Sequence, residues 1–240
     1  EAGFSTLYLK VGSDDPDLDL ARVAAARKGA GEPAKLRIDA NEAWSSGAAI
    51  RLVEAMVPYG LELVEQPISG RNLQEMAYVR GRIQPPLLTN EASWTRYDIL
   101  EVIRHGAGDV VSVDTQMDGG LLNMKRAAGI CEAAGIPVLK HSLGELGVAT
   151  YAGLHVIAST PNFLYANQGY GAFLTDDVLT GIDALPYENG HLEVPTGPGL
   201  GVELDTDKVA RYAALYDEQR AAFSFHEPAA MTATPLIPKL

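Results

Sequence analysis

The sequence predicts an α/β protein built as a (β/α) barrel, and two observations lead to this prediction. Short apolar runs alternate six times with longer stretches whose apolar residues recur at helical spacing. The repeating units are short, and no Gly-rich phosphate-binding loop follows the first apolar run. Alternating units give a parallel sheet with right-handed crossovers, so we expect a barrel, and the pattern leaves a doubly wound open sheet as the alternative.

The expected strands and helices follow one another along the chain in pairs. The apolar runs expected to form strands are residues 4–11, 36–39, 61–65, 86–91, 109–114 and 136–141. The helical stretches are residues 17–29, 48–60, 72–83, 96–108, 122–135 and 147–159. Three of them end in a glycine just before the next strand, at Gly60, Gly108 and Gly135, and glycine is the residue that a short helix-to-strand loop favours. We expect a barrel domain at residues 1–185 and a C-terminal segment, residues 186–240, that packs over it.

The composition is that of an ordinary globular protein, with 47% hydrophobic and 21% charged residues among 240. The formal net charge of −12 argues against nucleic acid or an anionic membrane surface as the main partner, because both favour clustered Lys and Arg. No apolar stretch approaches the roughly 20 residues that span a bilayer. The single cysteine, Cys131, lies in an apolar helical pattern and is expected to be a reduced core residue. We therefore expect a cytoplasmic protein.

An ionisable residue stands at the end of every expected strand. These residues are Lys10, Asp39, Glu65, Glu91, Asp114 and His141. Any one of them alone would be an ordinary turn or helix-capping residue. In a barrel, however, the carboxyl ends of all strands open onto one face, where the active site lies. The six residues are therefore expected to converge on one mouth.

The types of these residues point to metal-assisted proton transfer. Three carboxylates, Asp39, Glu65 and Glu91, can share a pocket only beside a cation, and an all-oxygen set selects Mg²⁺ before Mn²⁺ or Ca²⁺. Lys10, buried near a divalent cation, is expected to have a lowered pKa that suits a base. Asp114 could orient the His141 imidazole and stabilise its charged form. Such a site suits removal of a proton alpha to a carboxylate through an enediolate.

The sequence also resembles a known family. The motifs "YLKVG", "DANEAW", "VEQP", "TNEAS", "VDTQMDGG", "KHSLGELG" and "VPTGPGLGVELD" are together similar to the barrel domain of the enolase superfamily. The strand-end lysine with an Asp/His pair resembles its mandelate racemase subgroup. The resemblance implies a modified (β/α)7β TIM barrel, a Mg²⁺ site, and acid/base roles for Lys10 and for His141 oriented by Asp114. The muconate-lactonising branch has lysine where this chain has Asp114, so we expect the chain to stand outside that branch.

The chain departs from the family pattern in four ways. Tyr8 stands where the subgroup has a second lysine. The third metal ligand could be Asn90 or Glu91, and we choose Glu91 for its spacing from Glu65 and because Asn is the poorer ligand for a hard cation. The late glutamate of the family has no counterpart in "YANQ" at residues 165–168, which offers Asn167 or Gln168. The family has an N-terminal capping domain and a first barrel strand ahead of the segment that corresponds to "GFSTLYLKVG", and these 240 residues contain neither. We therefore expect this sequence to be part of a longer polypeptide.

These observations lead to three functional hypotheses. The first is dehydration of an acid sugar, an aldonate or aldarate, in which Lys10 or His141 removes the alpha proton and protonated His141 helps the beta hydroxyl to leave. The second is a racemase or epimerase of a 2-hydroxy acid or related carboxylate that uses the same two groups. The third is a barrel that binds metal without turnover. We expect Tyr8, Asn41 and Asn167 to contact the substrate, which is a small carboxylate, and by resemblance we expect a homo-oligomer.

Overall fold

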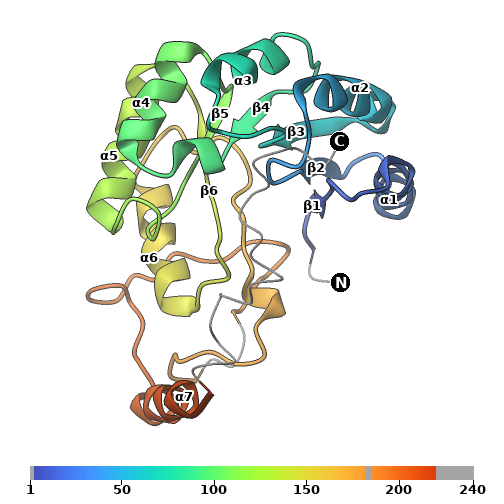
Figure 1. Ribbon diagram of the computed structural model, residues 1–240. Coiled ribbons are helices and arrows are strands. Elements are labelled where there is room, and N and C mark those ends of the chain that lie inside the picture. The colour runs from blue at the N-terminus through green and yellow to red at the C-terminus, as the bar shows by residue number, and fades with distance from the viewer. Residues whose placement is uncertain (1–2, 182–184, 220–240) are drawn as a thin grey trace.

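The computed structural model describes residues 3–181 and 185–219, and a parallel six-stranded sheet forms the centre of this part of the chain (Figure 1). The strands are β1 (Thr6–Lys10), β2 (Lys35–Asp39), β3 (Leu61–Glu65), β4 (Leu87–Thr89), β5 (Val110–Val113) and β6 (Val138–Lys140). They pair in chain order, and every pairing is parallel. A doubly wound sheet reverses its strand order at a switch point. The uninterrupted order therefore confirms the barrel-type arrangement.

The helices follow the strands in alternation and lie along the outside of the curved row of strands (Figure 1). They are α1 (Pro16–Ala30), α2 (Ser46–Met56), α3 (Leu73–Arg80), α4 (Arg96–His105), α5 (Leu121–Ala133) and α6 (Gly147–Ala158), with α7 (Thr206–Gln219) further along the chain. Short 3-10 helices are η1 (Val57–Tyr59), η2 (Glu91–Ser93) and η3 (Gly171–Phe173). The six strand–helix units predicted from the sequence are therefore all present.

Local sequence explains where the helices begin. The side chains of Asp15, Ser45 and Asn72 accept hydrogen bonds from the first-turn amides of α1, α2 and α3. Thr95 and Asp98 form a reciprocal capping box at the start of α4. These bonds satisfy amide groups that a helix cannot pair internally, so the loops before α1, α2, α3 and α4 each end at a defined residue.

The end of α4 differs from the prediction. The left-handed cap is Gly106, with φ 60°, and not Gly108. Gly108 is needed for a different reason, because a Cβ there would lie 2.5 Å from the Thr89 side chain. This close approach to β4 is a contact between distant residues, which the helical period does not predict.

Alternate strand residues face two different hydrophobic layers. Val64, Leu87, Val111 and Val138 pack in the large cluster between the strands and the outer helices. Leu63, Leu88, Val110 and Leu139 form a separate cluster, with Tyr8 and Tyr165 packed against it. Because successive strand residues point to opposite faces, this second cluster marks the barrel interior.

The chain after α6 runs beside β6 and then covers α6. Val138 and Phe163 form a parallel bridge, and the amide of Gln168 donates to the Lys140 carbonyl. Further on, Leu185 packs with Tyr151 in a cluster on α6. Residues 220–240 of the predicted C-terminal segment lie outside the described residues. In the described ranges, no helix has the length and apolar character to cross a membrane.

Candidate active site

The carboxyl ends of the first three strands place three ionisable residues side by side. Lys10 is the Cα partner of Asp39 in the pairing of β1 with β2, and Asp39 is the partner of Glu65 in the pairing of β2 with β3. Lys10 and Glu65 each lie two residues after a residue of the interior cluster, Tyr8 and Leu63. Since alternate strand residues share a face, these side chains lie at the carboxyl-end mouth of the barrel interior.

Lys10 is the exposed member of the set, with 58% of its side chain accessible to solvent. Its Nζ donates to Asp39 Oδ2 at 2.5 Å and to Asn41 Oδ1 at 2.6 Å. Partial burial lowers the pKa of Lys10, but the Asp39 carboxylate and then Glu65 raise it, with a net increase. In this structure the ammonium pairs directly with a carboxylate. The lowered pKa that we expected applies beside a divalent cation and stays a prediction.

Glu65 is fully buried and receives hydrogen bonds from two sides. Its Oε2 accepts from the Tyr8 hydroxyl and from Gln168 Nε2, the latter at 3.1 Å. Burial, followed by the charge of Asp39 and then that of Glu91, raises the pKa of Glu65 well above its ordinary value. The hydrogen bond from Tyr8 acts in the opposite direction and lowers this pKa, but it is outweighed. The charges of Asp39 and Glu91 therefore act on this carboxyl group at close range.

Glu91 stands at the start of η2, beyond the end of β4. Its Oε1 accepts from Asn41 Nδ2 at 2.8 Å. Burial raises the pKa of Glu91 to about 7, and the charges of Asp39 and Glu42 add to this increase. The hydrogen bond from Asn41 lowers the pKa but is outweighed. Asn41 thus bridges Lys10 and Glu91, which places this predicted substrate-contacting residue inside the acidic cluster.

The donor set of the cluster fits a hard cation. Glu65 Oε1 and Glu91 Oε2 are buried without a hydrogen-bond partner, and carboxylate oxygens are the ligands that Mg²⁺ prefers. The side chains do not surround a single point, however. Within residues 3–181 and 185–219, no three His, Cys, Asp or Glu side chains form a group that could hold one metal ion. In this arrangement Lys10 donates to Asp39 and Asn41 donates to Glu91.

His141 follows β6 directly, and only 11% of its side chain is exposed. Its Nδ1 lies 4.0 Å from Asp114 Oδ2, a distance too long for a direct hydrogen bond. Burial, with added contributions from the Lys140 and Lys10 ammonium groups, lowers the pKa of His141 to about 4, against the effect of Glu145. We expected a stabilised imidazolium, whereas this environment keeps the imidazole neutral at neutral pH.

Asn167 has a place different from the expected one. Its Oδ1 accepts a hydrogen bond of 2.7 Å from the backbone amide of Lys140, so it ties residues 162–168 to β6. The neighbouring Gln168 contacts Glu65 instead. Because side chains alternate along an extended segment, a shift of one residue decides which of the two faces the mouth.

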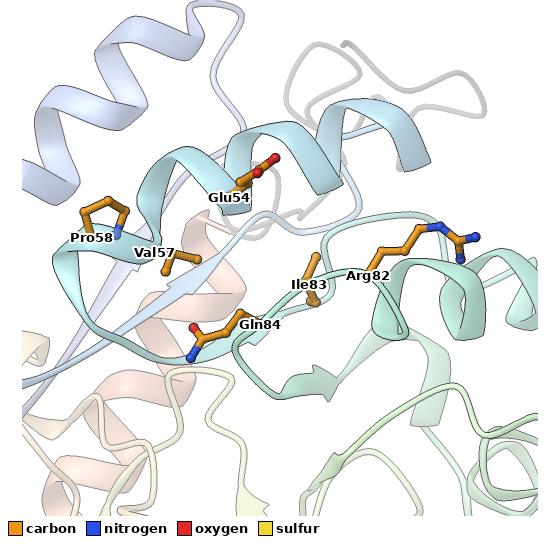
Figure 2. Close-up of a pocket in the computed structure, with 6 residues that line it drawn as sticks. All are labelled: Glu54, Val57, Pro58, Arg82, Ile83 and Gln84. Carbon is orange, nitrogen blue, oxygen red and sulfur yellow. The ribbon is translucent and has the colours of Figure 1, made fainter.

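A surface hollow lies at the other end of the strands (Figure 2). Its lining residues come from the end of α2, from η1 and from the loop before β4, and they are Glu54, Val57, Pro58, Arg82, Ile83 and Gln84. These segments lead into the amino ends of β3 and β4. The hollow is therefore separate from the carboxyl-end mouth where the ionisable residues gather.

Comparison with known proteins agrees with this arrangement. Residues 1–208 match the family described as enolase C-terminal domain-like. The chain belongs to the enolase superfamily. Within it, the similarity includes the mandelate racemase and muconate lactonizing subgroup.

Three relatives illustrate how far the similarity extends. Muconate cycloisomerase 1 of Rhodococcus opacus is 34% identical over 201 residues, which cover 84% of this chain and 54% of that protein. The hydrophobic dipeptide epimerase of Enterococcus faecalis is 32% identical over 204 residues, covering 83% and 56%. The crystal structure of an enolase from Mycobacterium smegmatis complexed with tartrate superimposes with a TM-score of 0.83 at 32% identity, covering 89% and 50%. The chain thus spans about half the length of the curated relatives it matches.

The similarity to muconate cycloisomerases bears on one expectation from the sequence. We placed the chain outside the muconate-lactonising branch because Asp114 stands where that branch has lysine. The similarity over 201 residues of this chain does not support this separation. The separation therefore rests on Asp114 alone and stays a prediction.

Two buried residues behind His141 were not identified from the sequence. Lys140 and Glu145 are each 3% exposed at the side chain, and they form an ion pair. Both lie in the motif "KHSLGELG", at residues 140–147. The sequence feature that could have revealed this pair is the lysine near the end of a run expected to be a buried strand, because an ammonium group in that place needs a partner of opposite charge.

Proposed function

We propose that this chain carries the catalytic residues of an enzyme that removes the proton alpha to the carboxylate of a small substrate. The observation that supports this proposal is the placement of two proton-transfer groups at opposite ends of the sheet. Lys10 ends β1 and His141 follows β6, and the acidic cluster lies on the strands between them. A substrate held at this cluster would present opposite faces of its alpha carbon to the two groups.

Asp39, Glu65 and Glu91 would hold a Mg²⁺ ion, in the proposed assignment. When bound, the ion would supply positive charge for the substrate carboxylate as negative charge develops on it. Asn90 Oδ1 and Glu91 Oε2 are both buried without a hydrogen-bond partner, and Glu91 is preferred because a carboxylate is the better ligand for a hard cation. Tyr8 and Gln168 orient the Glu65 carboxylate by donating to its Oε2.

His141 is the proposed base. Its neutral imidazole can accept the alpha proton, and the position of Asp114 near Nδ1 leaves Nε2 for the substrate. Lys10 is the proposed acid on the opposite face, where it donates a proton either to a leaving hydroxyl or back to the alpha carbon. The sequence left open whether Lys10 or His141 is the base and gave the role of acid to His141, whereas this assignment makes His141 the base and Lys10 the acid.

Dehydration of an acid sugar is the first candidate outcome. The mouth contains neutral polar side chains suited to a polyhydroxylated carboxylate, including Tyr8, Asn41 and Gln168. The Mycobacterium smegmatis relative was determined in complex with tartrate, a hydroxylated dicarboxylate. Both observations support an aldonate or aldarate as substrate.

Epimerisation is the second candidate, and the dipeptide epimerase relative favours it. It uses the same two groups, with removal of the proton on one face and return on the other. The two candidates differ in the substituent on the beta carbon, because only a beta hydroxyl can leave.

One experiment tests the proposal and separates the two outcomes. The protein that contains this chain is incubated with Mg²⁺ in D₂O against a panel of aldonates, aldarates and dipeptides, and proton NMR follows each compound. Loss of the alpha-proton signal with a 2-keto product indicates dehydration, and loss with an inverted centre indicates epimerisation. His105→Asn on the exposed surface of α4 is the matched control for His141→Asn. A panel in which no compound exchanges its alpha proton, while Mg²⁺ still binds, would instead support a metal-binding barrel without turnover.

The remaining predictions concern the setting of the site. We propose that residues 1–185 form the barrel unit, that the segment from residue 186 packs over α6, and that the protein is a cytoplasmic homo-oligomer. The contact between His155 Nε2 on α6 and the Leu200 carbonyl, at 3.0 Å, supports the second of these proposals. Sedimentation of the intact protein tests whether it is a homo-oligomer.

A further inference from the structure

Lys140 is a buried cation that the proposed reaction does not use. It ends β6, directly before His141, and its side chain is 3% exposed. Removing an ammonium group from water is costly unless other groups compensate it. The contacts of Lys140 therefore indicate what this residue does.

The Lys140 ammonium contacts three groups around the base. Nζ donates to the His141 carbonyl at 2.7 Å and to the Glu145 carboxylate, and it lies 3.8 Å from Asp114 Oδ2. The first contact holds the backbone that carries the imidazole. The third places a positive charge beside the carboxylate that faces the imidazole.

The helix outside β6 provides the space for this side chain. A Cβ on Gly153 of α6 would lie 2.7 Å from Lys140 Cε and 3.0 Å from Cδ. The Lys140 side chain therefore passes where α6 has no side chain, and its ammonium turns toward the carboxyl end of the barrel. Two elements, β6 and α6, together fix the position of the charge.

One oxygen atom faces two nitrogen groups. Asp114 Oδ2 lies 3.8 Å from Lys140 Nζ and 4.0 Å from His141 Nδ1. A carboxylate that already faces an ammonium group stabilises an imidazolium less, because the two positive charges repel each other. Lys140 therefore partly neutralises the negative charge of Asp114 and reduces the stabilisation that Asp114 gives to a protonated His141.

We propose that Lys140 is a positioning residue that holds Asp114 and the His141 backbone in place and keeps the imidazole neutral, so that His141 serves as a base. This proposal rests on the proposed function and refines its site. The charged groups that face His141 are Asp114 after β5, Lys140 and Glu145 beside it, and Lys10 on β1. Of these, Asp114 and Glu145 favour the imidazolium, and the two lysines oppose it.

The test is a histidine side-chain NMR titration of the protein labelled with ¹⁵N-histidine, with the His141 signal identified by its loss in His141→Asn. The wild-type midpoint is expected at about 4. The double variant Lys140→Met, Glu145→Gln removes the ammonium without leaving a buried carboxylate unpaired. Its His141 midpoint should lie about one to two pH units above that of Glu145→Gln, because these two variants differ only in the lysine charge, which opposes the imidazolium. Lys140→Arg keeps the charge, so its midpoint should stay close to that of the wild type.

Two results would overturn the proposal. One is a double variant whose His141 titrates with the same midpoint as Glu145→Gln. The other is a Lys140→Arg midpoint that moves as far as that of the double variant, because a purely steric role would produce this. If the double variant does not fold, Gly153→Ala decides, since its methyl group displaces the Lys140 side chain. An upward shift in that variant supports the proposal, and an unchanged midpoint contradicts it.

The titration needs no substrate, so its outcome is separate from that of the proposed function. If no carboxylate exchanges its alpha proton, the proposed function fails while the influence of Lys140 on His141 remains measured. If a substrate is found, the acidic limb of its kcat/KM profile should move with the NMR midpoint in each variant.

Discussion

The two sides of the barrel mouth hold their proton-transfer groups in different ways. On the β1 side, Lys10 has an exposed side chain and pairs directly with Asp39. On the β6 side, His141 is 11% exposed, and the ion pair of Lys140 with Glu145 is buried behind it. Burial thus sets the protonation of His141, whereas a neighbouring carboxylate sets that of Lys10. The difference shows how one mouth can hold a neutral base and a protonated acid together.

The acidic cluster between the two sides gives the largest expected effect. Glu91→Gln should weaken Mg²⁺ binding by more than about 100-fold, because loss of a direct ligand exceeds the loss of a supporting residue. Asn90→Ala at the adjacent position is the matched control and should retain measurable affinity. Isothermal titration calorimetry of both variants makes the comparison. Retained binding in Glu91→Gln together with lost binding in Asn90→Ala would move the ligand position by one residue.

The pH dependence of stability should differ between the two sides. The folded pKa of His141 is about 4, below the unfolded value near 6.5. The unfolded chain therefore binds more protons between these values, so this contribution is fully present above about pH 6.5 and is lost as the pH falls toward 4. It amounts to about 3 kcal/mol at most.

Urea unfolding with EDTA present measures this contribution. Between pH 7 and pH 4, the wild type should lose up to about 3 kcal/mol more unfolding free energy than His141→Asn does. Lys10→Arg keeps the positive charge beside Asp39, so it should follow the wild-type pH dependence. A parallel pH dependence in the wild type and His141→Asn would show that burial does not lower the His141 pKa.

The smallest expected effects concern the two donors to Glu65. Tyr8→Phe and Gln168→Leu each remove a hydrogen bond to Oε2 from a different side of the mouth. Loss of such a supporting bond should weaken Mg²⁺ binding by about 10-fold. Calorimetry that shows no change in either variant would remove Glu65 from the proposed ligand set.

Much of the barrel could be predicted from the sequence because its signals are local. Strand and helix periods, and the ionisable residue at each strand end, can be recognised within a few residues of the chain. The end of α4 could not be placed, because the close approach of Gly108 to Thr89 joins distant positions. The choice between Asn167 and Gln168 likewise depended on which side chain faces the mouth.

The electrostatic state of the site was the least predictable feature. The neutral form of His141 follows from its burial and from Lys140, whose position depends on the absence of a side chain at Gly153 on a helix further along the chain. The sequence placed an acid, a base and an orienting carboxylate at the mouth. It could not decide their protonation, because that depends on three-dimensional packing.

Alpha-proton exchange in D₂O tests the central claim most directly, since it asks which side of the mouth removes the proton. With Mg²⁺ and a substrate found in the panel, His141→Asn should abolish exchange, with a rate lowered by about 10²- to 10⁴-fold. Lys10→Met should still exchange the alpha proton but form no dehydrated or inverted product. Exchange that persists in His141→Asn and disappears in Lys10→Met would contradict this account and make Lys10 the base.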